Sequence, residues 1–204
     1  MIEVSQIFSD ENHSCEIDFS AANWATDQLN NIFHQAKLSI LHDVDFVAET
    51  DDAILLVEYK NSNLANAANP GAFMPLEDKK LDNVARKYYE SQYFLQAVQR
   101  GLHKEKRFVY ILEHDKGNST MRSLVRTHLA KRLPFLLQQQ VEMPEKLIDS
   151  IEVLSIEEWN EQYTQFPLKL VQEEDWMLLQ KIQHKYVTSF REPNKKIPYG
   201  KIKP

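Results

Sequence analysis

Residues 43–60 read D-V-D-F-V-A-E-T-D-D-A-I-L-L-V-E-Y-K, two largely apolar runs separated by a short polar stretch around Asp51 and Asp52. Two such runs flanking a turn signal predict a β-hairpin. A turn centred between residues 51 and 52 pairs residues whose numbers add up to 103. The register of this hairpin therefore places Asp45 directly opposite Glu58.

The predicted hairpin gathers charged side chains on one of its faces. Successive side chains of a strand alternate between faces, so Glu58 and Lys60 point the same way. Residues directly opposite in an antiparallel pair have Cβ atoms roughly 4.5–5.5 Å apart, which lets Asp45 and Glu58 hold one divalent cation between them. The same register sets Asp43 opposite Lys60. Like charges directly opposite each other destabilise a sheet, so the pairing of Asp45 with Glu58 favours a metal site between them.

Both faces of the hairpin are otherwise mostly apolar. Ionised groups in such a setting normally pair, bind a metal or lose their charge. An alternative interpretation is that the strand ends reach solvent, with Asp45 and Lys60 forming a diagonal ion pair. The apolar residues are Val44, Phe46, Ala48, Leu55, Val57 and Tyr59 on one face, and Val47, Ile54 and Leu56 on the other.

Asp45, a gap of twelve residues, and then Glu58-Tyr59-Lys60 resembles the signature of the PD-(D/E)xK nuclease superfamily. In that signature an aspartate at the start of one strand is followed by E-x-K on the next. The order of elements over about residues 20–115 is similar to the family core of helix, three-stranded meander, helix and strand. The resemblance implies an α/β fold, a restriction-endonuclease-like three-layer sandwich around a mixed central sheet, with additional C-terminal helices.

The chain departs from the family pattern at two points. The residue before Asp45 is Val44, where the signature has proline. Many members also carry an acidic residue on the first helix, for which Asp27 and Glu16 are the nearest choices here. The second metal position that such an acid would serve is therefore left open.

The resemblance implies a metal-dependent nuclease that hydrolyses phosphodiester bonds in DNA or RNA. Asp45 and Glu58 would ligate Mg²⁺, or Mn²⁺ as a substitute, with the Tyr59 carbonyl as a third protein oxygen. Lys60 would position or deprotonate the attacking water and offset negative charge in the transition state. Asp43 would not bind the metal itself but would orient these ligands.

Hydrophobic periodicity and cap signals predict the remaining elements. On the helix expected over 78–100, Gln92 falls on the apolar stripe, one turn after Tyr88. It is a second candidate, beside Asp43, for supporting the metal ligands. The alternative is a surface glutamine that forms hydrogen bonds with a loop. Ser155 and Glu158 have the spacing of a capping box. The other expected helices cover 21–37, 120–133 and 170–190, and the expected strands cover 1–8, 15–19, 38–42, 44–49, 53–60, 107–112 and 151–154.

Length and composition predict a single domain, which the resemblance implies to be a nuclease-like domain over residues 1–190, and the lysines and prolines of residues 191–204 predict a loosely ordered basic tail. Of the 204 residues, 43% are hydrophobic and 26% charged, which is typical of a globular chain. The single cysteine, Cys15, excludes an intrachain disulfide and agrees with a cytoplasmic location. There is no long apolar run, so no membrane is expected, and no glycine-rich phosphate loop.

Charge is divided unevenly along the chain. Residues 1–78 carry 2 basic and 14 acidic side chains, residues 79–134 carry 13 and 5, and residues 135–204 carry 9 and 11. A basic middle segment beside an acidic hairpin suits a polyanion. Together with the resemblance, which implies a nuclease, it makes nucleic acid, with DNA first, the expected partner. The alternative is that these charges only solvate surface helices.

Two further functions compete with the nuclease. One is a catalytically silent module of the same fold that binds nucleic acid or a protein partner. The other is a scaffold in which Asp43, Asp45, Glu58 and Lys60 form a charge network. A homodimer is compatible with the enzyme but is not indicated by any motif.

Overall fold

The computed structural model describes residues 6–63, 73–114 and 118–171. The chain separates into two compact units, residues 1–170 and 171–204, and every helix and strand described below belongs to the first. The expected helix over 170–190 and the tail over 191–204 fall almost wholly outside the described residues. No helix among the described residues is long and apolar enough to cross a membrane.

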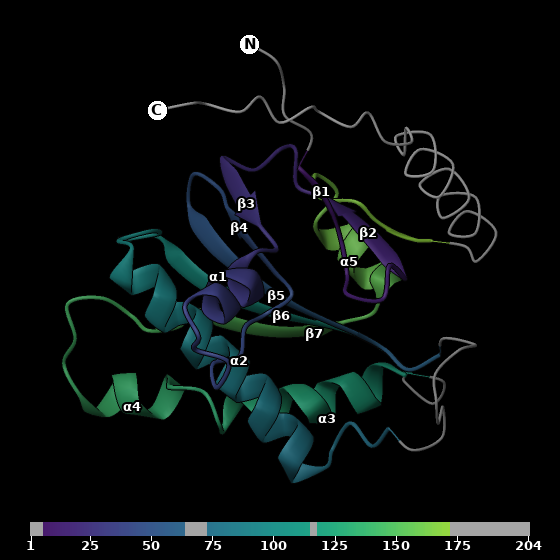
Figure 1. Cartoon of the computed structure of the whole chain (residues 1–204). Helices are drawn as coiled ribbons and strands as arrows, with labels where there is room; N and C mark the ends of the chain where they lie inside the picture. Colours follow the sequence, from purple (N-terminus) through teal and green to yellow (C-terminus); the bar gives the residue numbers. More distant parts are fainter. Residues whose placement is uncertain (1–5, 64–72, 115–117, 172–204) are drawn as a thin grey trace, which may run out of the picture. The chain divides into compact units, whose positions relative to one another are not determined.

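A five-stranded mixed sheet forms the centre of the first unit, in the order β3-β4-β5-β6-β7 (Figure 1). β3, β4 and β5 are antiparallel neighbours, whereas β6 and β7 continue the sheet parallel to β5. The strands are β3 (Trp24–Thr26), β4 (Phe46–Glu49), β5 (Ala53–Asn61), β6 (Glu105–Glu113) and β7 (Ser150–Leu154).

A second, smaller sheet has the order β1-β2-β8 and is antiparallel throughout. It joins the start of the unit to its end, because β8 pairs with β2. Its strands are β1 (Ile7–Ser9), β2 (Cys15–Asp18) and β8 (Leu168–Leu170).

Two hydrophobic cores lie on opposite faces of the large sheet. One face is covered by three helices, α1 (Leu29–Gln35), α2 (Asp78–Ala97) and α3 (Ser119–Ala130). The other face is covered by the small sheet and α5 (Ile156–Gln162). Figure 1 shows this arrangement, with α2 and α3 on one side and β1, β2 and α5 on the other. The short helix α4 (Phe135–Gln140) lies between α3 and β7 in the chain.

The predicted hairpin is confirmed with its register. β4 and β5 pair Phe46 with Val57 and Glu49 with Ile54, so every paired set adds up to 103. Within the paired strands the alternation of faces is also confirmed, because Val47, Ile54 and Leu56 enter the core under the helices, whereas the intervening residues enter the other core. The face expected for Val44 is wrong: it lies in the core under the helices, because it precedes β4, where strand alternation no longer applies, and its N–H donates a hydrogen bond to Ser91 of α2. Strand period and turn chemistry are local properties, which is why the sequence predicts them.

Four other expected elements agree with the structure. The helix predicted over 78–100 is α2, the strand over 107–112 is the centre of β6, the helix over 120–133 is α3, and the strand over 151–154 is β7. The capping box before α5 is present in full. The Ser155 hydroxyl accepts a hydrogen bond from Glu158 N–H at 3.1 Å, and the Glu158 carboxylate accepts one from Ser155 N–H at 2.8 Å.

The helix expected over 21–37 is wrong in its first half. Residues 24–26 form β3 instead, because the edge of β4 offers a partner for their backbone: Ala25 lies opposite Ala48. The Trp24 ring is also covered by Arg100, whose guanidinium carbon lies 4.1 Å from the ring centroid. Helix α1 therefore begins only at Leu29 and lies within the meander, between its first and second strands.

The short strand expected over 38–42 is absent from the described structure. Side chains of α2 bind this segment in place of a neighbouring strand. Arg86 donates a hydrogen bond to the Ile40 carbonyl, and the Glu90 carboxylate accepts one from His42 N–H. The backbone groups that a sheet would pair are thus satisfied by a helix.

Candidate functional site

Asp45 and Glu58 lie at the end of the hairpin that the predicted register assigns to them, and both contact the same lysine. The ladder of β4 and β5 ends at the pair Phe46 and Val57, and Asp45 is the next residue out from it. Its Oδ2 accepts a hydrogen bond of 2.8 Å from Tyr59 N–H, which fixes the carboxylate beside the strand end. Glu58 is buried, with 8% of its side chain exposed.

A lysine from α2 lies between the two carboxylates. Lys87 Nζ is 2.8 Å and 2.9 Å from the two oxygens of Glu58 and 3.6 Å from Oδ1 of Asp45. Its side chain is 27% exposed, and that of Asp45 is 19% exposed. The Lys87 ammonium thus offsets part of the negative charge of two acids, one just before β4 and the other in β5.

Helix α2 is held in place to present this lysine. Val84 and Ser91 are buried on the core side of α2, and Lys87, three residues after one and four before the other, shares their face. The Ser91 hydroxyl accepts a hydrogen bond of 3.0 Å from Val44 N–H, one residue before Asp45. One face of α2 therefore binds the backbone just before β4 through Ser91 and also places the Lys87 ammonium beside Asp45 and Glu58.

Burial dominates the electrostatics of the site. It raises the pKa of Glu58 from 4.5 to about 8, assisted by the negative charge of Asp45 and opposed by Lys87. The pKa of Asp45 is also raised by burial, against Lys87 and the hydrogen bond from Tyr59. Although burial acts to lower it, the pKa of Lys87 is raised by Glu58 and then Asp45. The site therefore attracts positive charge.

Asp43 lies within the electrostatic reach of the same site. Burial raises its pKa from 3.8 to about 6, and the largest opposing effect comes from Lys87, followed by a hydrogen bond from Asn30 N–H. Asp45 contributes repulsion. Its expected role in supporting the ligands agrees with this proximity and stays a prediction.

Lys60 does not take the position between the two carboxylates that Lys87 occupies. It is exposed, and its Nζ lies 5.8 Å from the centroid of the Phe73 ring. The sequence assigns the ammonium of the site to Lys60, two residues after Glu58, whereas the structure brings Lys87 there. The N–H of Tyr59 donates a hydrogen bond to Asp45, and its ring is buried in the core on the other face of the sheet, with the small sheet and α5. The role of its carbonyl as a metal ligand stays a prediction.

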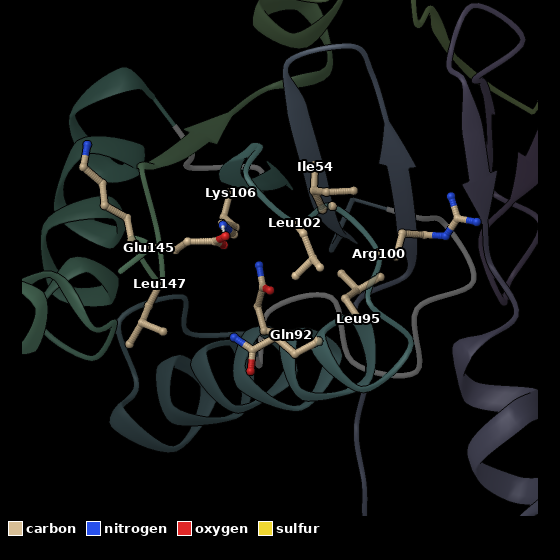
Figure 2. A pocket seen from close by; sticks show the side chains of 11 residues that line it. Ile54, Gln92, Leu95, Arg100, Leu102, Lys106, Glu145 and Leu147 are labelled. Atoms are coloured by element: carbon tan, nitrogen blue, oxygen red, sulfur yellow. Dashed lines mark hydrogen bonds and ion pairs between the residues drawn. The ribbon is translucent and has the colours of Figure 1, made fainter. Parts of the chain in front are cut away.

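Gln92 lies elsewhere. It lines a small pocket together with Ile54, at the start of β5, and Lys106, near the start of β6, whereas Glu58 lies near the far end of β5. Figure 2 shows this pocket, in which Lys106 and Glu145 lie close together. Lys106 Nζ and Glu145 Oε2 form an ion pair of 3.1 Å. The amide of Gln92 is 3.4 Å from the Tyr88 hydroxyl, so the residue serves the packing of α2 rather than the two carboxylates.

The acid sought on the first helix is not found among the described residues of α1. Asp27 lies just before α1, and Glu16 lies in β2 of the small sheet, opposite Lys169. Glu11, in the turn between β1 and β2, is the acid that acts on the site, since its charge contributes to raising the pKa of both Asp43 and Asp45.

Among residues 6–63, 73–114 and 118–171, no group of three or more His, Cys, Asp or Glu side chains is arranged to hold a metal ion. The side-chain donor set is therefore the pair of carboxylates. Carboxylate oxygens are the ligands that Mg²⁺ prefers, and this ion is commonly bound by one or two of them with waters completing its shell. The chemistry of the pair fits such an ion.

The basic segment over 79–134 is largely neutralised inside the protein. Of the twelve Lys and Arg residues that the structure describes in this segment, eight form ion pairs with Asp or Glu side chains. Surface ion pairs contribute little stability, but they do reduce the field that a polyanion would meet. They are Arg86, Lys87, Arg100, Lys104, Lys106, Arg107, Arg122 and Arg132.

Lys87 is the site residue that reasoning from sequence missed. A signal for it is present, because a lysine at the spacing of Val84 and Ser91 falls on the buried side of an amphipathic helix. A buried lysine requires an acidic partner. Which acid it meets depends on how α2 packs on β5, and no local pattern contains that information.

Comparisons of this chain with protein-family models, with curated proteins and with solved structures find no match.

Proposed function

We propose that this chain is a metal-dependent nuclease of the PD-(D/E)xK superfamily, with a restriction-endonuclease-like fold. The observation that carries the proposal is the meeting of Asp45 and Glu58 around a single positive charge at the end of the hairpin. Two acids brought together from separate segments of the chain are costly unless a cation joins them. The proposed fold is supported by a mixed sheet with helices against it, in which a meander is followed by α2 and a parallel strand, whereas the position of α1 inside the meander departs from the family order.

In this proposal Asp45 and Glu58 hold Mg²⁺ or Mn²⁺, with the Tyr59 carbonyl as a further candidate ligand. A bound divalent cation supplies polarisation of a phosphate oxygen and lowers the pKa of water. The hydrogen bond from Tyr59 N–H keeps Asp45 oriented. Lys60, exposed next to the site on the same face of β5, is available to orient the attacking water or to bind the phosphate.

The substrate class is a nucleic acid, with DNA as the first choice. The site lies where Asp45 precedes β4 and Glu58 approaches the end of β5, at the edge of the sheet where the parallel strands also end. In open α/β sheets ligands bind outside the carboxyl ends of such strands. Lys60, which is exposed at this end of β5, would contact the phosphates.

The test is cleavage of supercoiled plasmid DNA and of end-labelled RNA in the presence of MgCl₂ or MnCl₂. We expect Asp45→Asn and Glu58→Gln to reduce cleavage by at least about 100-fold, since each removes a charged metal ligand. Glu142→Gln is the control, because it changes net charge equally at an exposed residue after α4. Equal cleavage by all four proteins would contradict the assignment and point to a contaminant.

A second candidate is favoured by the position of Lys87. Because its ammonium satisfies Asp45 and Glu58 without a metal, the same structure suits a catalytically silent module that binds nucleic acid or a protein. Binding of DNA or RNA in an electrophoretic mobility assay, without cleavage at any metal concentration, would support this module over the enzyme.

A further inference from the structure

The position of Lys87 bears on how the site is regulated. Its Nζ lies within 2.9 Å of both oxygens of Glu58 and 3.6 Å from Asp45. A Mg²⁺ ion held by both carboxylates would stand at about 2.0–2.1 Å from their oxygens. It would therefore stand close to the place that the ammonium fills.

Charge makes joint occupation unfavourable. Asp45, Glu58 and Lys87 together carry one net negative charge when all are ionised, and replacement of Lys87 by a divalent ion brings the pair to neutrality. With both cations present, positive charges would face each other at short range in a site where Glu58 is only 8% exposed. Such repulsion is strong where water is excluded.

We propose that Lys87 is an internal competitor of the metal, which must leave the two carboxylates before a divalent cation binds to them. This inference rests on the proposed function, since it assumes the same metal site. The side chain of Lys87 is 27% exposed, so the ammonium has a route to solvent. The lysine preserves the geometry of the acids without metal and sets the threshold concentration for metal binding.

The first test is calorimetric titration with MnCl₂, without nucleic acid, of the wild-type chain, Lys87→Met and Lys80→Met. Methionine keeps the length of the side chain and removes the charge. We expect Lys87→Met to bind Mn²⁺ at least about tenfold more tightly than the wild type, because a buried competing charge has been removed. Lys80, exposed in the first turn of α2, is the matched control and should leave the affinity unchanged.

The second test uses the unmodified chain and does not depend on the folding of a variant. Lys87 should react slowly with acetic anhydride in EDTA, because its ammonium is paired and largely buried. With saturating MnCl₂ its labelling, followed by mass spectrometry of the peptide, should rise several-fold, whereas that of Lys80 should stay constant. Protection of Lys87 that persists at saturating metal would overturn the proposal.

The outcomes separate this inference from the nuclease. Tighter Mn²⁺ binding by Lys87→Met, with no cleavage by any protein, supports the competition and rejects the enzyme. If the wild type cleaves nucleic acid and Lys87→Met binds Mn²⁺ no more tightly than the wild type does, the competition is rejected and the enzyme is retained. If no protein binds Mn²⁺, both are rejected.

Discussion

Glu58→Gln tests the electrostatics of the site most directly. The substitution keeps the size of the side chain and removes the charge that is the most deeply buried of the pair. In the folded protein the pKa of Glu58 is about 8, against an ordinary value of 4.5. The folded chain therefore holds this proton more tightly than the unfolded chain does.

The sign and size of the effect follow from that difference. Stability from this group is fully present below about pH 4.5 and is lost as the pH rises through about 8, because the unfolded chain releases the proton first. Between pH 5 and pH 8 the free energy of unfolding of the wild type should fall by about 3 kcal/mol on account of Glu58 alone. Glu58→Gln should lack this part of the fall, so its free energy of unfolding should depend less on pH between 5 and 8. Asp43, whose pKa is raised to about 6, adds a smaller fall in the same direction to both proteins.

The assay is urea unfolding in EDTA at pH 5, 6.5 and 8, followed by tryptophan fluorescence. Glu142→Gln serves as the control and should follow the wild type. Addition of MgCl₂ at pH 8 should restore stability to the wild type and not to Glu58→Gln, because a ligand that binds only the folded state stabilises it. Parallel pH profiles for the wild type and Glu58→Gln would refute the reasoning, since Glu58 would then not hold the proton.

Three further predictions concern the scaffold and use thermal unfolding or thiol reactivity. Gly101→Ala should lower stability by about 2–4 kcal/mol, because Gly101 has φ +68° and an added Cβ would lie 2.1 Å from Ile54 Cγ1; an unchanged melting temperature would contradict this. Ser155→Ala should cost about 1 kcal/mol through loss of the capping box with Glu158, and Ser155→Thr should retain most of that stability. The Cys15 thiol, fully buried and with its pKa raised by burial, should react with a disulfide reagent only as fast as the chain unfolds; rapid reaction in the native protein would refute its burial.

Reasoning from sequence succeeds where the interaction is local. The hairpin of β4 and β5, the capping box and the apolar strand β6 each follow from a repeat of two residues or from a short motif. It fails where a segment has a choice of partners. Residues 24–26 lie in a stretch that carries helical periodicity, yet they pair with the free edge of β4. Residues 38–42 have strand character, yet α2 binds their backbone.

The candidate site divides in the same way. By itself the sequence determined the register that carries Asp45 and Glu58 to the same end of the hairpin, because strand alternation and a tight turn leave one register that buries the apolar residues. Only the tertiary structure decided which ammonium meets them and that Gln92 belongs to another pocket, since both depend on the angle and height at which α2 packs on β5. Packing of a helix on a sheet is set by the whole core, and a helix face allows several neighbours, so a one-dimensional pattern cannot select Lys87 over Lys60.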